Sequence, residues 1–261
     1  MSDLDRNYTS PFGRAAGRAD AATVDAGLRA YMLRIYNYMS IGLAITGLAA
    51  LGVYIAAVTS DPSAAVAHVG KVDLTPFGYA MFVSPLKWLF ILAPLGLVML
   101  LSFRIQSMSL GAAQLTFWAY AALVGLSLAG IFLVYTGTSI ARVFFITAAT
   151  FAAMSLYGYT TRADLSRFGS FLFMGLIGII LASLVNIFVQ SSALQFALSV
   201  AGVLVFTGLT AWDTQQIKEM YWEADGDVIA GKKAIMGALR LYLDFINLFL
   251  MLMQLMGNRR N

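Results

Sequence analysis

The sequence lacks cysteine altogether and has a single histidine, His68. Without thiols the chain can form no disulfide and carry out no thiolate chemistry. One isolated histidine also argues against a zinc site, a haem site or a histidine-based catalytic triad, each of which needs further partners. We therefore expect no resident cofactor and no cysteine- or histidine-based enzyme activity.

Charged residues are scarce as well. They make up 11% of the 261 residues, where a soluble domain normally carries about 25%, while 60% of the chain is hydrophobic. The formal net charge is only +4, and in such a chain basic residues first report orientation in a membrane. We expect an integral membrane protein in contact with lipid, and no nucleic-acid partner.

Seven long apolar segments indicate an all-α membrane protein. A helix needs about 20 apolar residues to cross the hydrocarbon core. Most connections between the segments are short, so consecutive helices should be antiparallel neighbours, whereas residues 58–85 should form an external loop. The expected spans are 33–57, 86–103, 112–135, 139–159, 169–190, 194–212 and 234–256.

The N-terminal segment, residues 1–28, is small, polar and of mixed charge, and it lacks the apolar centre of a signal peptide. We expect a mobile cytoplasmic tail there, followed by a transmembrane domain at 29–261. With the N-terminus inside, most lysines and arginines fall on the cytoplasmic side. No organelle signal is visible, so the expected location is the bacterial cytoplasmic (inner) membrane.

The last apolar segment carries Asp244 near its middle. A charge at that depth costs roughly 2.5–3.5 kcal/mol or more, which marks a candidate functional site. Arg240, Asn247 and Gln254 recur with it at helical spacing on one face. We expect this polar stripe to face the bundle interior and the apolar side to face lipid. Alternatively, Asp244 is neutralised by Arg240 one turn earlier.

Charge and length give different answers about how this segment ends. A re-entrant end would place Arg259 and Arg260 inside, as the distribution of positive charge slightly favours. The segment, however, is about 35 Å long as a helix, enough for a tilted crossing. We expect a full crossing.

A second acid, Asp213, lies in GLTAWDTQQIKEMY, where apolar sequence gives way to polar. Alone, such an acid is usually a solvated interface residue. If Asp213 and Asp244 face each other, burial and repulsion favour one proton shared by the pair. Losing that proton would force the acids to separate, hydrate or recruit a cation. Contact requires the sixth helix to continue through Gln216 or the seventh to start later.

Two other polar positions have open interpretations. Arg104, which closes the second segment, is either a headgroup anchor or a counter-charge to Asp213. Asn186, on the fifth segment, either bonds across helices or lines a pore.

Four stretches resemble the Bax inhibitor-1 family, in its bacterial branch. They are SFRIQSMS, SIARVFFITAATFAAMSLYGYTT, GLTAWDTQQIKEMY and ALRLYLDFINLFLMLMQLMG. The resemblance runs from about residue 30 to the end of the chain. It implies a seven-helix fold in which a central, strongly apolar helix is wrapped by the other six, and a role in pH-dependent calcium leak.

The resemblance also implies roles for individual residues. The family's paired aspartates map to Asp213 and Asp244, and its second-helix arginine maps to Arg104. These three would sense pH and gate the path, with calcium bound transiently by the two acids. Related sequences often read Ala-Tyr-Asp where this chain has Ala-Trp-Asp, which puts any role of a tyrosine hydroxyl there in doubt. The residues that could line the path are Arg240, Asn247 and Asn186.

Two functions are compatible with these features. The first is a pH-sensitive calcium leak channel gated by the proton-sharing aspartates. The second is a regulatory membrane protein that binds a membrane-bound ATP-dependent protease, as some bacterial relatives do, through residues 1–28 and the 218–233 loop. We do not expect an enzyme, because the surroundings of Asp213 and Asp244 do not resemble those of intramembrane aspartyl proteases.

Overall fold

The structure, a computed structural model, describes residues 11–260, with side chains from Ala26 onward. In this part of the chain seven helices are long and apolar enough to cross a membrane, which confirms the expected seven-helix all-α membrane protein. These helices are α1 (Pro11–Ala57), α3 (Lys87–Arg104), α4 (Leu110–Leu128), α6 (Gly137–Thr160), α7 (Ser166–Val189), α8 (Ser192–Glu219) and α9 (Asp227–Met256).

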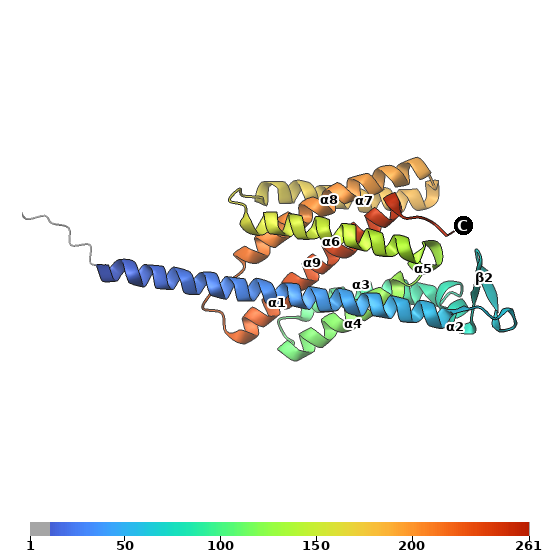
Figure 1. The fold of residues 1–261 in the computed structure, drawn as a ribbon, viewed down its shortest axis with the longest axis horizontal. Helices are drawn as coiled ribbons and strands as arrows, with labels where there is room; N and C mark the ends of the chain where they lie inside the picture. The colour runs from blue at the N-terminus through green and yellow to red at the C-terminus, as the bar shows by residue number, and fades with distance from the viewer. Residues whose placement is uncertain (1–10, 261) are drawn as a thin grey trace, which may run out of the picture.

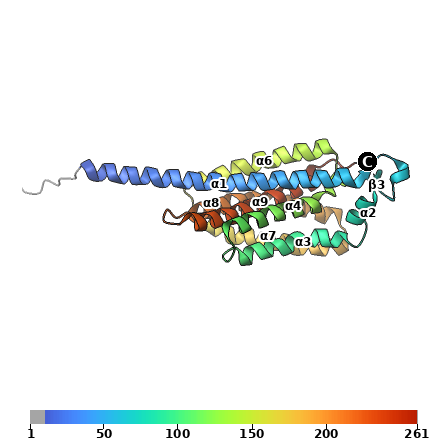
Figure 2. The ribbon, with the colours of Figure 1, turned by 90° about the horizontal axis from the view of Figure 1, so that it is seen from below.

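The helices form two groups with α9 between them. In one group α4 packs against α1 and α3, and in the other α8 packs against α6 and α7. Helix α9 contacts α1, α4, α6 and α8, and it runs obliquely through the middle in Figure 1. Figure 2 shows the same bundle from below, with α3 and α7 at its edge. The two groups are therefore joined through α9.

Helix α9 is the central helix, which corrects the expectation that its apolar side faces lipid. Of its most apolar stretch 61% is buried, against 6% for α3 and α7. Tyr242 on that side is fully buried and packs edge-on against Phe117 and Tyr120 of α4. Hydropathy measures preference for an apolar environment, and a protein interior meets that preference as well as lipid does.

Local signals set the ends of several helices. The Ser109 hydroxyl accepts a hydrogen bond from the Ala112 N–H and caps α4, and Ser191 caps α8 in the same way. Gln190, in the left-handed conformation at φ 52°, ends α7 immediately before that cap. The α7–α8 connection is thereby as short as expected, and the two helices pack together.

The connection 58–85 contains more regular structure than the expected loop. Strands β1 (Val58–Thr59), β2 (Ala67–Val69) and β3 (Val72–Leu74) form an antiparallel sheet in the order β1-β3-β2. Gly70, at φ +59°, makes the tight turn between β2 and β3. The other elements outside the long helices are η1 (Pro62–Ala64), α2 (Pro76–Phe82) and α5 (Ile131–Val134). Strands of two or three residues are too short to give a periodic sequence signal.

The C-terminal end of α9 reaches the same end of the bundle as the 58–85 connection. Arg259 forms a β-bridge with Tyr135, and the Arg260 guanidinium donates a hydrogen bond to the Tyr54 hydroxyl at 2.7 Å. Tyr54 lies in the last turn of α1, next to β1. The 30 residues of α9 extend about 45 Å, so the last helix is long enough for a full crossing of the membrane.

The expected N-terminal tail lies only partly within the structure. Residues 1–10 fall outside the described residues. From Pro11 the backbone is already helical and continues into the first span as α1, whereas the expectation placed a mobile tail up to residue 28. Polar residues give way to apolar ones near residue 28. This change of composition indicates where the chain enters an apolar environment, and it does not indicate where the helix begins.

Candidate functional site

The end of α8 determines whether the two acids can meet. This helix continues to Glu219, past the expected end at residue 212, and α9 begins at Asp227 instead of 234. Gln215 explains the longer helix, because its amide is fully used in the interior. It accepts from the Leu165 N–H at 2.8 Å and donates to the Ala163 carbonyl at 2.9 Å. Polar residues that looked like a loop thus belong to a helix packed against a neighbouring turn.

Asp213 and Asp244 interact directly, side chain to side chain, across the α8–α9 contact. The Asp213 side chain is 13% exposed and Asp244 is 5% exposed. The Oδ2 atom of Asp244 has no hydrogen-bond partner among the described residues. A buried carboxylate oxygen without a donor is costly, and a proton carried by the pair removes that cost.

Arg240 is the cation of this site. Its Nη1 lies 3.8 Å from the Asp213 Oδ1, and its side chain is 45% exposed. At that distance the attraction is that of charge without a directed hydrogen bond. Within the described residues Asp213 is the only carboxylate at ion-pair distance from Arg240, so the alternative of an internal pair with Asp244 is not formed. One arginine thus faces two acids.

Arg104 does not belong to this cluster, in contrast to the role that the resemblance implied. It is exposed at the end of α3 and makes no ion pair within the described part of the chain. The reason is topological: α3 packs mainly on α4, in the group that does not contain α8. Its position agrees with the other interpretation, a headgroup anchor.

The two candidate lining asparagines act locally. Asn247, which is half-buried, donates to the Leu243 carbonyl of its own helix at 2.8 Å. The Asn186 side chain accepts from the Ser191 N–H at 3.0 Å and closes the α7–α8 turn, so it is not part of the acidic cluster. The indole of Trp212 lies against Gly169 of α7. The side chain of Trp212, which precedes Asp213 in the sequence, therefore points toward α7.

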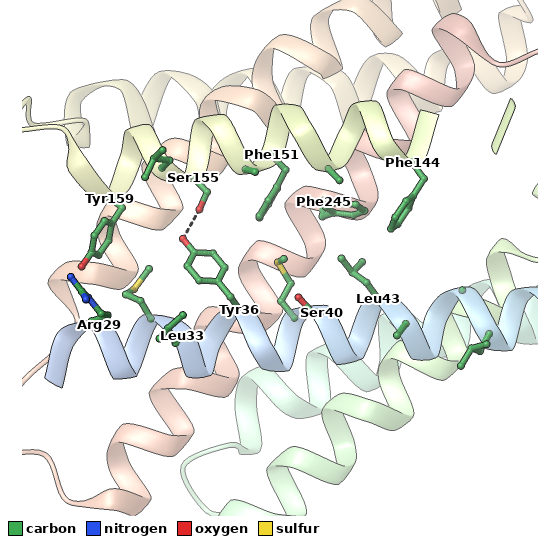
Figure 3. Close-up of a pocket in the computed structure, with 18 of the residues that line it drawn as sticks. Arg29, Leu33, Tyr36, Ser40, Leu43, Phe144, Phe151, Ser155, Tyr159 and Phe245 are labelled. Atoms are coloured by element: carbon green, nitrogen blue, oxygen red, sulfur yellow. Dashed lines mark hydrogen bonds between the residues drawn. The ribbon is translucent and has the colours of Figure 1, made fainter. Parts of the chain in front are cut away.

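A chain of hydroxyl groups next to Asp213 was not singled out from the sequence. Tyr36 of α1 and Ser155 of α6 are hydrogen-bonded at 2.5 Å, as Figure 3 shows, and Ser155 is bonded to Thr214 of α8 at 3.0 Å. Hydroxyl residues in apolar spans commonly bond across helices. Their presence could be noted from the sequence, but their partners depend on which helices are neighbours.

The acidic pair offers few ligands for a metal ion. The described residues contain no cluster of three or more histidine or acidic side chains. Calcium takes six to eight oxygen ligands. At Asp213 and Asp244 it would draw most of these from water and backbone carbonyls, as an ion in transit does.

The sequence is similar to a known protein family and to several bacterial proteins. The sequence model of a family described as "Inhibitor of apoptosis-promoting Bax1" matches residues 28–261. An uncharacterized protein of Rickettsia prowazekii is 49% identical over 239 residues, 92% of this chain and 94% of that protein. The Escherichia coli inner membrane protein YbhL is 49% identical over 237 residues, 90% of this chain and 94% of its own length. A Caulobacter vibrioides protein is 42% identical over both full chains.

Proposed function

This chain belongs to the Bax inhibitor-1 family, and we propose that it is a pH-gated calcium leak channel in which Asp213 and Asp244 form the gate. The observation that carries the proposal is the direct interaction between α8 and α9 of two carboxyl groups, that of Asp244 buried and that of Asp213 mostly shielded from solvent. The relative named as an inner membrane protein supports the inner membrane as its location.

Charge balance supports a gate that responds to protons. Two ionised acids beside one arginine leave one negative charge uncompensated, whereas one shared proton makes the cluster neutral. Two like charges about 4 Å apart repel by about 4 kcal/mol at an effective dielectric constant of 20. That energy corresponds to roughly a thousandfold change in an equilibrium, enough to shift helices between two packings.

Opening would then separate α8 from α9. Arg240 and Asp244 lie on the same helix, one turn apart, so they move together and Asp213 moves relative to both. Separation would expose carboxylates, the ligands that calcium prefers and that select cations in pores. Thr214, which follows Asp213 in α8, is bonded to Ser155, and these two hydroxyls would be the next oxygen atoms offered to an ion.

We place the N-terminus in the cytoplasm. The ends of α3 and α8 carry Arg104 and Lys218, and the second turn of α9 carries Lys232 and Lys233. Short loops rich in lysine and arginine remain on the cytoplasmic side.

The test is calcium flux into proteoliposomes between pH 5 and 8, for the wild type, Asp213→Asn and Asp244→Asn. The wild type should show a pH-dependent flux, and each substitution should flatten the profile because an amide cannot lose the gating proton. Unchanged flux and an unchanged profile in both variants would refute the mechanism.

Asp164→Asn is the matched control. The Ser166 N–H donates to the Asp164 carboxylate at 2.9 Å and holds the pKa of Asp164 below its ordinary value. A depressed pKa keeps this exposed acid ionised from pH 5 to 8. Its loss should therefore leave the shape of the profile unchanged.

The regulatory role is the second candidate, and the length of α1 favours it. This helix extends well beyond the other helices in Figures 1 and 2, and so could reach a partner at the membrane surface. Deletion of residues 1–28 should then abolish co-purification with a membrane-bound ATP-dependent protease and leave calcium flux intact. Loss of flux with retained co-purification would contradict a role of residues 1–28 in binding the protease.

A further inference from the structure

A groove of about 990 Å³ runs between α1 and α6. Helix α1 packs on α4 and α9, and α6 packs on α8 and α9, so α9 lies against both helices that border the groove. Phe245 of α9 lies between Phe151 and Phe144 in Figure 3 and forms part of the groove's inner wall. The groove is separate from the acidic pair, neither member of which lines it.

The walls of the groove are apolar and reach the molecular surface. Leu33 and Leu48 of α1 are 55% and 71% exposed, and Leu156 of α6 is 63% exposed. Along α1 the lining extends from Arg29 to Leu51, about 33 Å of helix, against a hydrocarbon core about 30 Å thick. In a membrane this groove therefore opens sideways to the acyl chains along nearly their whole depth.

One end of the groove is cationic. Arg29 and Tyr159 point toward each other there, as Figure 3 shows. The Lys218 Nζ lies 5.4 Å from the centre of the Tyr159 ring and donates to the Tyr159 carbonyl. No described carboxylate lines the groove, and its other end is formed by apolar residues such as Leu51 and Phe144.

We propose that this groove is a binding site for one membrane phospholipid with an anionic headgroup, its phosphate at Arg29 and an acyl chain along α1 and α6. Arginine matches phosphate in charge and geometry, and the apolar walls match a hydrocarbon chain. Tyr36 and Ser155 are hydrogen-bonded directly across the groove, so α1 and α6 are too close there to admit a third helix 10–12 Å wide.

The first experiment fills the groove. The purified full-length chain is delipidated and titrated with phosphatidylglycerol, or with phosphatidylethanolamine of the same acyl chains, and bound lipid is counted by native mass spectrometry. Gly47 lines the groove and has nothing within 4 Å of an added Cβ. Gly47→Phe should weaken phosphatidylglycerol binding at least about tenfold.

Gly52→Phe is the control for folding and for added bulk. Gly52 lies on the same helix, outside the groove, and an added Cβ there also meets nothing within 4 Å. Its binding should equal that of the wild type. Equal loss in both variants, or no loss in Gly47→Phe, would overturn the site.

The second experiment removes the charge. Arg29→Gln should reduce the preference for phosphatidylglycerol over phosphatidylethanolamine about fivefold, since one basic residue near the headgroups contributes about that much. Arg34→Gln, exposed on α1 but not in the groove, should preserve the preference. Equal binding of both lipids by the wild type would overturn the headgroup assignment. A dimer lost only in Gly47→Phe would show that a second copy occupies the groove.

Discussion

Arg240 pairs with a different acid from the one that the sequence offered as an alternative partner. Helical spacing pairs it with Asp244, one turn away, but the structure pairs it with Asp213 on the neighbouring helix at 3.8 Å. Spacing reveals only neighbours within one helix. The two acids themselves were identifiable from the sequence, because a charge in an apolar span is costly wherever it points.

This pairing predicts the effect of Arg240→Gln. The guanidinium favours the ionised form of the pair, so without it the proton is held to higher pH. The midpoint of the flux profile should rise by roughly 0.7 pH unit, an effect of about 1 kcal/mol for a half-exposed charge. Flux in proteoliposomes at closely spaced pH values measures this shift, and a midpoint that stays or falls would contradict it.

Arg104→Gln is the matched comparison for Arg240→Gln. Arg104 is exposed and unpaired within the described residues, so its loss should leave the midpoint where it is. If Arg104→Gln moves the midpoint and Arg240→Gln does not, the second-helix arginine is the tether that the resemblance implies, and the pairing in this structure does not control the gate.

At the level of elements, the sequence identified the helices better than their ends. Asp213 seemed too close to the surface to meet Asp244, because TQQIKE looked like the start of a loop. The buried amide of Gln215, bonded to the 161–165 turn, keeps α8 helical to Glu219. Such a bond joins segments about fifty residues apart, so the composition of a short stretch of sequence cannot predict it.

Close packing of α6 on α8 makes a second prediction. A methyl group added at Gly158 would overlap the backbone carbonyl of Ala211, and backbone cannot move aside cheaply. Gly158→Ala should lower stability by about 1–3 kcal/mol. Thermal unfolding in detergent would show this as a lower midpoint.

Gly96→Ala on α3 provides the reference, since an added Cβ there meets nothing within 4 Å. Alanine is also the better helix former, so this variant should be as stable as the wild type or slightly more stable. Equal midpoints for the two variants would mean that α6 and α8 do not pack at Gly158 as described.

At the level of the whole molecule, the number of helices followed from composition but the identity of the central one did not. Helix α9 is less hydrophobic than α7, although α9 is far more buried. The distinction depends on which apolar surfaces meet each other and which meet lipid. Only the resemblance implied a central helix, and it did not say which.

The position of α9 predicts the effect of truncation. A chain ending at residue 226 lacks the helix that contacts α1, α4, α6 and α8, so its two groups should lose their fixed arrangement. Limited proteolysis in membranes should cut it much faster than the full chain. A chain ending at residue 256 keeps α9 and loses only the contacts of the last residues, among them the bonds of Asn258, Arg259 and Arg260, and it should resist nearly as well as the full chain.

The central helix is also the last of the seven described helices to be synthesised. Since the chain is made from its N-terminus, both three-helix groups enter the membrane before the piece that joins them exists. Until α9 has been synthesised, the surfaces that will hold it must be covered by lipid or by the insertion machinery. The nascent protein thus waits, half-assembled, for the thirty residues of α9, and a message cut short before them yields two groups of helices without the helix that joins them.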